Sequence, residues 1–180
     1  MLYMFLAEGF EETEAIASLD VIRRAGIEIK TVGVSGKEVC GSHGVKVLAD
    51  IELPDVSFDD MQGVILPGGM PGTTNLQNNE EVKKSILYCA ENNLLVAAIC
   101  AAPMVLGGLG LLKGKNAVCY PGFEQYLDGA TLCADGAVMD GNVVTGKGAG
   151  ASMLFGAKIV DFFMPGKGEE ILAQMQHLID

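Results

Sequence analysis

Cys100 is the residue of this sequence whose type and position most favour chemistry. An unbroken apolar run at residues 94–99 has the length of a strand covered on both faces, and Pro103 suits the first turn of a helix. Cys100 is therefore expected at a turn from a buried strand into a helix. Because the first N–H groups of a helix lack intrahelical partners and carry the positive end of its dipole, a thiolate at that turn is stabilised.

Such a position makes a cysteine reactive. The pKa of a cysteine at a helix N-terminus can fall from about 8.5 to roughly 3.5–7.5, which makes the thiol nucleophilic and easily oxidised at neutral pH. The small residues Ala101 and Ala102 leave room for a substrate, and their N–H groups are candidate donors to an oxyanion. The alternative is a buried cysteine that packs as a small hydrophobe, as most free cysteines do.

An acidic cluster follows the apolar run at residues 2–7. Its members are Glu8, Glu11, Glu12 and Glu14. Most of them are expected in a solvated loop and helix start, where carboxylates are favoured by the dipole. A carboxyl beside a thiolate would instead stay protonated, because two adjacent negative charges raise one pKa, and it would donate a hydrogen bond to the sulfur. Spacing alone does not choose between Glu11 and Glu14.

Other motifs predict no cofactor and no metal. Residues 141–148 nearly match a phosphate-binding loop, but glycine stands where Ser or Thr must hold magnesium, and the middle of the run is typical of a strand. No dinucleotide fingerprint is present. His43 and His177 are expected far from the crevice in which Cys100 would lie, so a cysteine–histidine pair and a papain-like hydrolase are not expected.

The elements that would position Cys100 form an α/β pattern. A strand at residues 2–7, a helix at 13–25 and a strand at 27–34 make a right-handed βαβ unit, which builds parallel sheets. Residues 33–53 predict an antiparallel excursion of short strands. The parallel pattern resumes with a strand at residues 63–66, followed by a glycine-rich turn.

The second half of the chain continues this pattern. We expect a helix from Asn75 or Asn78 to about residue 92, the strand before Cys100, and a helix from residue 102 to about 109. A strand at 116–120, a hairpin with a type I′ turn at Asp140-Gly141, and two closing helices at 148–163 and 168–179 follow. In a parallel sheet the loops after strands meet at one edge, so the loops at 8–12, 67–72 and 100–102 are expected to converge on one crevice.

Composition sets limits on the class of protein. The 180 residues, 49% apolar and without low-complexity runs, predict a single domain over residues 1–180. Five scattered cysteines, with neither histidine at zinc-ligand spacing, predict reduced thiols and no structural metal. A net charge of −11 argues against nucleic acid and anionic membranes as partners. With no membrane span or signal peptide in the sequence, we expect a cytoplasmic protein.

Five motifs in order resemble the ThiJ/PfpI superfamily, and most closely its branch containing the parkinsonism-associated protein deglycase and its bacterial relatives. They are AEGFEETE at residues 7–14, RRAG at 23–26, LPGG at 66–69, AAICAAP at 97–103 and VTGKG at 144–148. The resemblance covers essentially the whole chain. It implies a flavodoxin-like α/β sandwich of three layers with a mostly parallel sheet, usually a homodimer, with Cys100 at a strained nucleophile elbow.

The resemblance also implies site residues. Glu14 matches the family's glutamate, whose protonated carboxyl bonds the cysteine sulfur, and Gly69 and Ala101 match the backbone groups of the oxyanion pocket. Gly68 and Tyr120 would line the pocket. Tyr120 departs from the histidine of the parkinsonism-associated relative; a phenol of pKa near 10 is a poor base but can donate a hydrogen bond, which leaves proton transfer at this position open.

The resemblance implies a cofactor-free enzyme that acts on small 2-oxoaldehydes such as methylglyoxal, or on their protein adducts. In this hypothesis Cys100 adds to the aldehyde and Glu14 shuttles protons. Alternatives are a non-enzymatic oxidative-stress sensor, in which Cys100 is oxidised to sulfinate, and a chaperone. Peptidase activity is not expected, because Ala101 stands where the protease branch has a histidine. Whether Cys119 can act as a second thiol is open.

Overall fold

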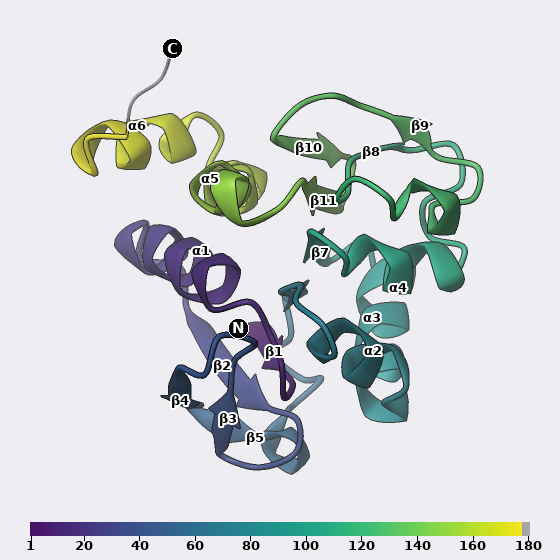
Figure 1. The fold of residues 1–180 in the computed structure, drawn as a ribbon. Helices are drawn as coiled ribbons and strands as arrows, with labels where there is room; N and C mark the ends of the chain where they lie inside the picture. Colours follow the sequence, from purple (N-terminus) through teal and green to yellow (C-terminus); the bar gives the residue numbers. More distant parts are fainter. Residues whose placement is uncertain (178–180) are drawn as a thin grey trace.

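A seven-stranded sheet forms the middle layer of the molecule (Figure 1). The computed structural model describes residues 1–177. In sheet order the strands are β10 (Ala137–Asp140), β11 (Val143–Gly146), β7 (Leu95–Ile99), β6 (Gly63–Leu66), β1 (Leu2–Leu6), β2 (Ile29–Gly33) and β5 (Ile51–Glu52). All neighbours pair in parallel except β10 and β11. The predicted flavodoxin-like α/β class is confirmed.

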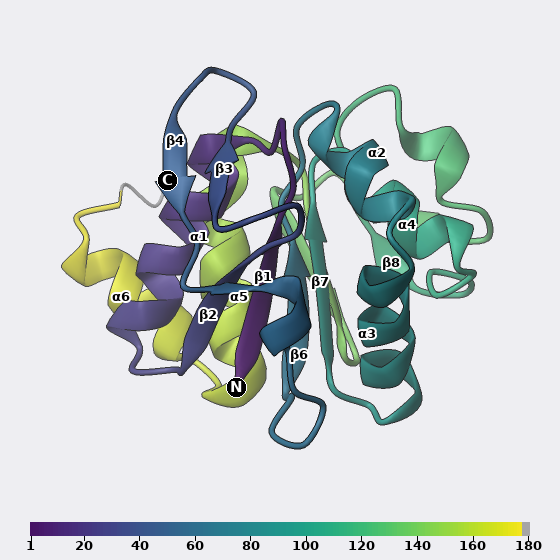
Figure 2. The same cartoon turned by 90° about the horizontal axis from the view of Figure 1, so that it is seen from below.

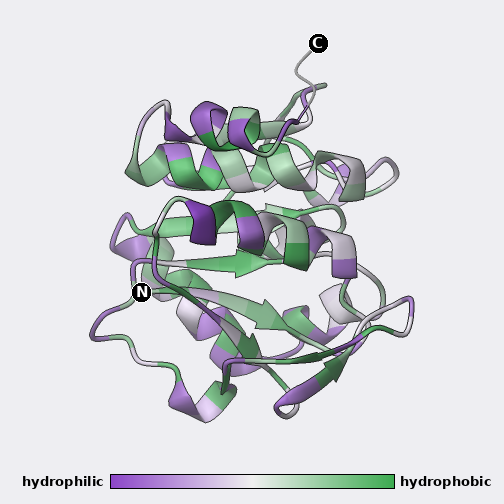
Figure 3. Cartoon of the chain, turned by 90° about the vertical axis from the view of Figure 1, so that its left-hand side faces the viewer, coloured by the Kyte–Doolittle hydropathy of each residue, from purple (hydrophilic) through white to green (hydrophobic). Residues whose placement is uncertain are grey.

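Helices cover both faces of the sheet (Figure 2). One face carries α1 (Glu12–Arg24), α5 (Ser152–Phe163) and α6 (Lys167–Gln174). The other carries α2 (Gly72–Gln77), α3 (Glu80–Glu91) and α4 (Pro103–Gly108). The central strands are hydrophobic, whereas hydrophilic residues gather on the outer surfaces of the helices (Figure 3). This pattern is what a parallel sheet covered on both faces requires.

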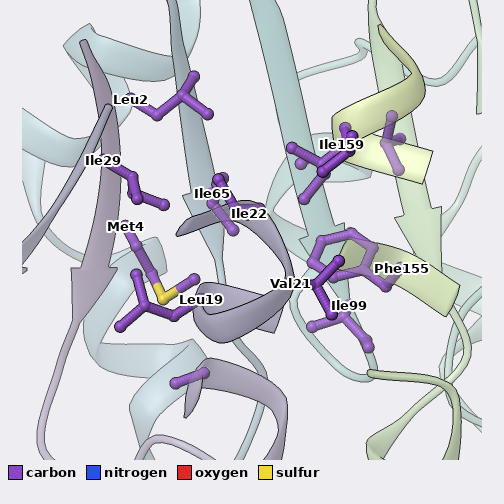
Figure 4. Close-up of a cluster of buried hydrophobic side chains, with 14 of the residues drawn as sticks. Leu2, Met4, Leu19, Val21, Ile22, Ile29, Ile65, Ile99, Phe155 and Ile159 are labelled. Atoms are coloured by element: carbon purple, nitrogen blue, oxygen red, sulfur yellow. The ribbon is translucent and has the colours of Figure 1, made fainter. Parts of the chain in front are cut away.

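Two hydrophobic clusters fill the spaces between the layers. Side chains alternate along β1, so that Leu2 and Met4 face α1 and α5 while Tyr3 and Phe5 face α3 and α4. Figure 4 shows part of the first cluster, with residues from α1, α5 and the strands packed together. Helices α1 and α5 approach closely at Gly156, where a Cβ would lie 3.0 Å from that of Val21.

The excursion at residues 33–53 is confirmed as antiparallel. β3 (Glu38–Cys40) and β4 (Lys46–Leu48) form a two-stranded sheet of their own, and β5 then returns to the edge of the main sheet. A short 3-10 helix, η1 (Leu53–Asp55), follows β5. No helix within residues 1–177 is long and apolar enough to cross a membrane.

Several predicted boundaries were wrong. The helix expected from Asn75 or Asn78 is two helices, because Asn79 caps α3 by accepting hydrogen bonds from the N–H groups of Glu81 (3.0 Å) and Val82 (3.1 Å). The strand expected at residues 116–120 is reduced to β8 (Asn116–Ala117), which pairs outside the main sheet with β9 (Thr131–Leu132). The short 3-10 helix η2 (Glu124–Tyr126) lies between them.

The hairpin between β10 and β11 has a different turn from the predicted one. Asp140 pairs with Val143, so the two loop residues are Gly141 and Asn142. A type I′ turn needs positive φ at both of them, but only Gly141 has it (φ 61°). Downstream, the 3-10 helix η3 (Ala149–Ala151) precedes α5, and α6 ends at Gln174. Residues 178–179 of the predicted last helix lie outside the described residues.

Candidate active site

Cys100 occupies the predicted turn between β7 and α4. Its φ is +65°, a left-handed conformation that costs a residue with a side chain about 1–3 kcal/mol. Two backbone hydrogen bonds hold it there: its N–H donates to the Gly146 carbonyl (2.9 Å), and its carbonyl accepts from the Tyr120 N–H (2.8 Å). The thiol is partly buried. Strained residues that the surrounding structure fixes in this way cluster at active sites.

Glu14 reaches Cys100 from the first turn of α1. Its side chain is buried, and its Oε2 atom accepts a hydrogen bond from the Gly68 N–H (2.8 Å). The same carboxyl group shares a hydrogen bond with the Cys100 thiol. Gly68 makes this approach possible, because a Cβ at that position would lie 2.6 Å from the Cβ of Cys100 and 2.7 Å from Glu14 Oε2. The structure therefore brings three predicted residues together.

Backbone donors surround the sulfur on its remaining side. The N–H groups of Gly69 and Ala101 form hydrogen bonds with the Cys100 sulfur. Gly69 has φ +87°, and the Glu11 N–H donates to the Gly68 carbonyl (2.9 Å), which fixes the turn after β6 against the loop after β1. The loops after β1, β6 and β7 thus converge at one edge of the sheet, as the sequence predicts.

The thiol and the carboxyl form a coupled acid pair. Burial, together with the charge and hydrogen bond of the neighbouring Glu14, raises the pKa of Cys100 to about 12, although the N–H groups of Ala101 and Gly69 act in the opposite direction. Burial likewise raises the pKa of Glu14 to about 7, against the hydrogen bonds from Cys100 and Gly68. The direction for Cys100 is opposite to the predicted one, because α4 has only six residues and burial beside a carboxyl outweighs its dipole.

Tyr120 and Cys119 lie beside Cys100 in different ways. Tyr120 contacts Cys100 through its backbone and is half exposed, with its ring against Gly148, where a Cβ would lie 3.2 Å from the Tyr120 Cδ2 atom. Cys119 is buried in the cluster under α3 and α4, whereas Cys100 packs on the α1 and α5 side. The two cysteines therefore pack in different hydrophobic clusters.

The structure corrects the prediction that His43 lies far from the crevice. Glu12 Oε1 accepts hydrogen bonds from the N–H groups of His43 (2.8 Å) and Val45 (3.2 Å), and Oε2 contacts His43 Nδ1 (3.0 Å). His43 Nδ1 also lies 3.2 Å from Glu11 Oε2. These contacts tie the loop between β3 and β4 to the N-terminus of α1. Gly41 lies directly beside the Glu12 carboxyl, where a Cβ would clash with the Glu12 side chain.

Electrostatics distinguish this second cluster from the Cys100 pair. Burial alone would raise the pKa of Glu12, but its hydrogen bonds, including those from His43 and Val45, lower it to about 2. Hydrogen bonding to Glu12 and the charge of Glu11 raise the pKa of His43. Among the described residues, Glu11, Glu12 and His43 are the group whose ligand atoms could surround a metal ion. Their polar atoms already satisfy one another, and we assign no metal to them.

The phosphate-loop resemblance at residues 141–148 carries no nucleotide site. Val143 to Gly146 form strand β11, paired with β7, so the N–H groups that would cradle a phosphate serve the sheet. The polar groups that contact the Cys100 side chain are Glu14 and the N–H groups of Gly69 and Ala101.

Together the fold and this cluster define an α/β protein with a cysteine–glutamate pair at the C-terminal edge of a parallel sheet. The family model described as "DJ-1/PfpI family" matches residues 1–162. The chain therefore belongs to the DJ-1/PfpI family.

Individual relatives agree with this assignment. The chain is 36% identical to "Protein DJ-1 homolog B" of Arabidopsis thaliana over 87% of its length, and spans only 36% of that longer protein. It is 36% identical to "Protein dj-1beta" of Drosophila melanogaster, covering 88% of this chain and 86% of the relative. It is 29% identical to the "Glutathione-independent glyoxalase DJR-1.2" of Caenorhabditis elegans, covering 89% and 86%.

A solved structure shares the fold over almost the whole chain. "Toxoplasma gondii DJ-1, oxidized" superimposes with a TM-score of 0.93 at 29% identity, covering 99% of this chain and 98% of that one.

Proposed function

We propose that this protein is a cysteine-dependent, cofactor-free enzyme that converts small 2-oxoaldehydes such as methylglyoxal, free or as protein adducts, to 2-hydroxy acids. The observation that carries the proposal is the Cys100 thiol held between the Glu14 carboxyl and the N–H groups of Gly69 and Ala101. The name of the Caenorhabditis elegans relative, a glutathione-independent glyoxalase, supports the same chemistry.

The first step is addition of sulfur to the aldehyde. The Cys100 sulfur forms a bond to the aldehyde carbon, the thiol proton passes to Glu14, and the oxygen that gains the electron pair is stabilised by the Gly69 and Ala101 N–H groups. Return of the proton to this oxygen gives a hemithioacetal. Glu14 is the group within reach of both the sulfur and the reacting carbon.

The second step moves two protons within the substrate. Glu14 removes the proton from the former aldehyde carbon and returns a proton to the neighbouring ketone carbon, while the hydroxyl proton on the first carbon passes to the former ketone oxygen, which leaves a thioester of the 2-hydroxy acid. Water then cleaves the carbon–sulfur bond and restores the thiol. One carbon is oxidised and its neighbour is reduced, so the overall reaction is 2-oxoaldehyde plus water to 2-hydroxy acid. No external oxidant is required.

Methylglyoxal consumption without glutathione tests the proposal. We expect wild-type protein to produce lactate, Cys100→Ser to lose turnover by at least about 10³-fold while keeping its circular dichroism spectrum, and Cys119→Ser to behave as wild type. Cys119 is the matched control because it is buried in the other hydrophobic cluster. Equal activity in wild type and Cys100→Ser would refute the mechanism.

A second candidate function is a redox sensor at the same residue. Cys100 is partly exposed, as are Cys40 and Cys133, while Cys89 and Cys119 are buried. Cys100 differs from the other exposed thiols in having Glu14 placed to hydrogen-bond an oxidised sulfur. Two equivalents of peroxide would convert the thiol to sulfenic and then sulfinic acid, releasing water each time. Mass mapping after mild peroxide treatment distinguishes this function: modification of Cys100 before the other four thiols is required, and uniform oxidation would exclude it.

We further propose that the protein is a homodimer in a reducing compartment such as the cytoplasm. Support for the dimer comes from apolar side chains exposed on α1 and on the β3–β4 excursion, elements that Glu12 ties together: Ile16, Val45 and Leu48, with Leu48 71% exposed. Sedimentation analysis tests this, with Leu48→Glu expected to shift the population toward monomer. All five cysteines are unpaired in the structure, as a reducing compartment requires.

A further inference from the structure

A cavity of about 380 Å³ lies between the two chain segments that follow the backbone hydrogen-bond partners of Cys100. It is lined by Tyr120, Pro121, Lys147, Gly148, Ala149, Gly150 and Ala151. Its two walls begin at the backbone partners of Cys100, since Tyr120 donates to the Cys100 carbonyl and Lys147 directly follows Gly146, which accepts from the Cys100 N–H. The segments that line the cavity therefore also hold the backbone of Cys100 in place.

The lining leaves the cavity open. Residues 148–151 read Gly-Ala-Gly-Ala, so no large side chain from that wall fills the space. At Gly148 a Cβ would lie 3.2 Å from the Tyr120 ring and would push the ring, whereas at Gly150 a Cβ would meet nothing within 4 Å. The volume falls within the range of about 300–1,000 Å³ typical of small-molecule sites, and exceeds what the roughly five heavy atoms of methylglyoxal need.

The polar side chains of this lining, those of Lys147 and Tyr120, can both donate hydrogen bonds. Lys147 is exposed and forms no ion pair with any of the described residues, although the whole chain carries a net charge of −11. The Tyr120 phenol supplies a hydroxyl. No carboxylate belongs to the lining. An unpaired cation, a phenol and an apolar wall together fit the anionic end of a short aliphatic chain.

We propose that this cavity is a substrate subsite for 2-oxoaldehydes that carry a carboxylate or phosphate a few carbons from the reacting carbonyl. The proposal rests on the proposed function. The aldehyde lies at Cys100, the intervening carbons lie along residues 148–151, Lys147 pairs with the anion, and Tyr120 donates a hydrogen bond to it. Tyr120 and Lys147 then act as specificity residues, without a part in the chemical steps.

Steady-state kinetics with two substrates test the subsite. Methylglyoxal and 4,5-dioxopentanoate share the reacting group, and only the second carries a carboxylate. We expect Lys147→Gln to raise the ratio of KM for 4,5-dioxopentanoate to KM for methylglyoxal about tenfold, with kcat for 4,5-dioxopentanoate retained, and Tyr120→Phe to raise it about threefold. Sodium chloride should raise KM for the anionic substrate in wild type but not in Lys147→Gln.

Lys158→Gln is the matched control, because Lys158 is also exposed and forms no ion pair among the described residues, but lies on α5 outside the cavity. The KM ratio should not change in this variant. If wild type turns over methylglyoxal but Lys147→Gln leaves the ratio unchanged, the subsite is refuted and the proposed function stands. An equal change in Lys158→Gln would also refute it, because the effect would be one of net charge.

A binding measurement keeps the two proposals separate. 4-Oxopentanoate has the carboxylate and a ketone but no aldehyde, so it occupies the subsite without reacting. We expect NMR titration to show weak binding to wild type and to Cys100→Ser, at least fivefold weaker in Lys147→Gln. Binding that depends on Lys147 in a protein without turnover would support the subsite and refute the proposed function. Binding that does not depend on Lys147 would refute the subsite.

Discussion

Glu12 and Glu14 are two residues apart at the start of one helix, yet the pKa values of their carboxyl groups are shifted in opposite directions. The pKa of Glu12 is lowered to about 2, and that of Glu14 is raised to about 7. Both side chains are largely buried. Because successive residues of a helix are rotated by about 100°, positions 12 and 14 face nearly opposite directions. Glu12 faces the β3–β4 excursion, and Glu14 faces the sheet edge at Cys100.

The number of donors decides between the two outcomes. Glu12 accepts hydrogen bonds from two N–H groups of the excursion and lies beside a histidine and a serine hydroxyl. Glu14 accepts from one N–H group and shares its other bond with a thiol that is itself an acid. Burial therefore raises the pKa where donors are few and is outweighed where donors are many. The environment of Glu14 suits proton transfer, and that of Glu12 suits structural support.

The largest effect that separates the two glutamates is expected in catalysis. Glu14→Gln should reduce kcat/KM for methylglyoxal by about 10²–10⁴-fold, because amide cannot take the thiol proton. Glu12→Gln, measured below its unfolding temperature, should keep kcat/KM within a few-fold. Similar losses in both variants would show that Glu14 acts through the fold and not through proton transfer.

The pH profile sharpens the comparison further. The addition step needs the Cys100–Glu14 pair with one proton, whichever group holds it. Since that form appears as pH rises through about 7, kcat/KM should increase about tenfold between pH 5.5 and pH 6.5 and level off above pH 8. Glu12→Gln should leave the midpoint in place. A midpoint near 4.5 would mean that the Glu14 carboxyl is not in the environment described.

Stability should respond in the opposite order. Glu12→Gln is expected to lower the free energy of unfolding at pH 7 by about 1–3 kcal/mol, because an amide replaces a carboxylate that accepts several hydrogen bonds. A group whose folded pKa is lowered stabilises above its unfolded pKa of about 4.5 and loses this contribution as pH falls toward 2. Urea denaturation of both proteins at pH 7 and pH 3 measures it, and the difference should shrink at pH 3.

The smallest effect is expected from Glu14 on stability. A carboxyl whose folded pKa is raised to about 7 stabilises below about pH 4.5, and this contribution disappears as pH rises through 7. At pH 8, Glu14→Gln should therefore have a free energy of unfolding about 1 kcal/mol higher than that of wild type, measured by urea denaturation. At pH 4.5 the variant should show no gain. A variant less stable than wild type at both values would contradict the assignment.

The position of Cys100 was predictable because an apolar strand followed by proline has few other structural meanings. Its pKa was not: the dipole argument requires a helix, but α4 is short, and the carboxyl that opposes it comes from residue 14, far away in the sequence. The prediction of a strand at residues 116–120 also depended on distant residues. Strand β11 pairs with β10 on that side, which leaves β8 outside the main sheet.

The choice of Glu14 over Glu11 came from the family resemblance, and the structure gives its physical reason. Glu11 is the N-cap of α1, where its side chain accepts from the Thr13 N–H (3.4 Å) and lies beside Ser42 and His43. A cap residue cannot also point into the sheet edge. The role of His43 could not be read from the sequence, because it depends on how the β3–β4 excursion folds back onto α1.

The close approach of α1 and α5 at Gly156 has a consequence for how the protein is made. At about 5–20 residues per second, α1 leaves the ribosome roughly 6 to 26 seconds before α5 begins to appear. During that interval α1 lacks its main packing partner, and the surface at Ser18 and Val21 that Gly156 later contacts is uncovered. Synthesis thus delivers Cys100 before α5, and the layer that α1 and α5 form together is completed only when α5 docks.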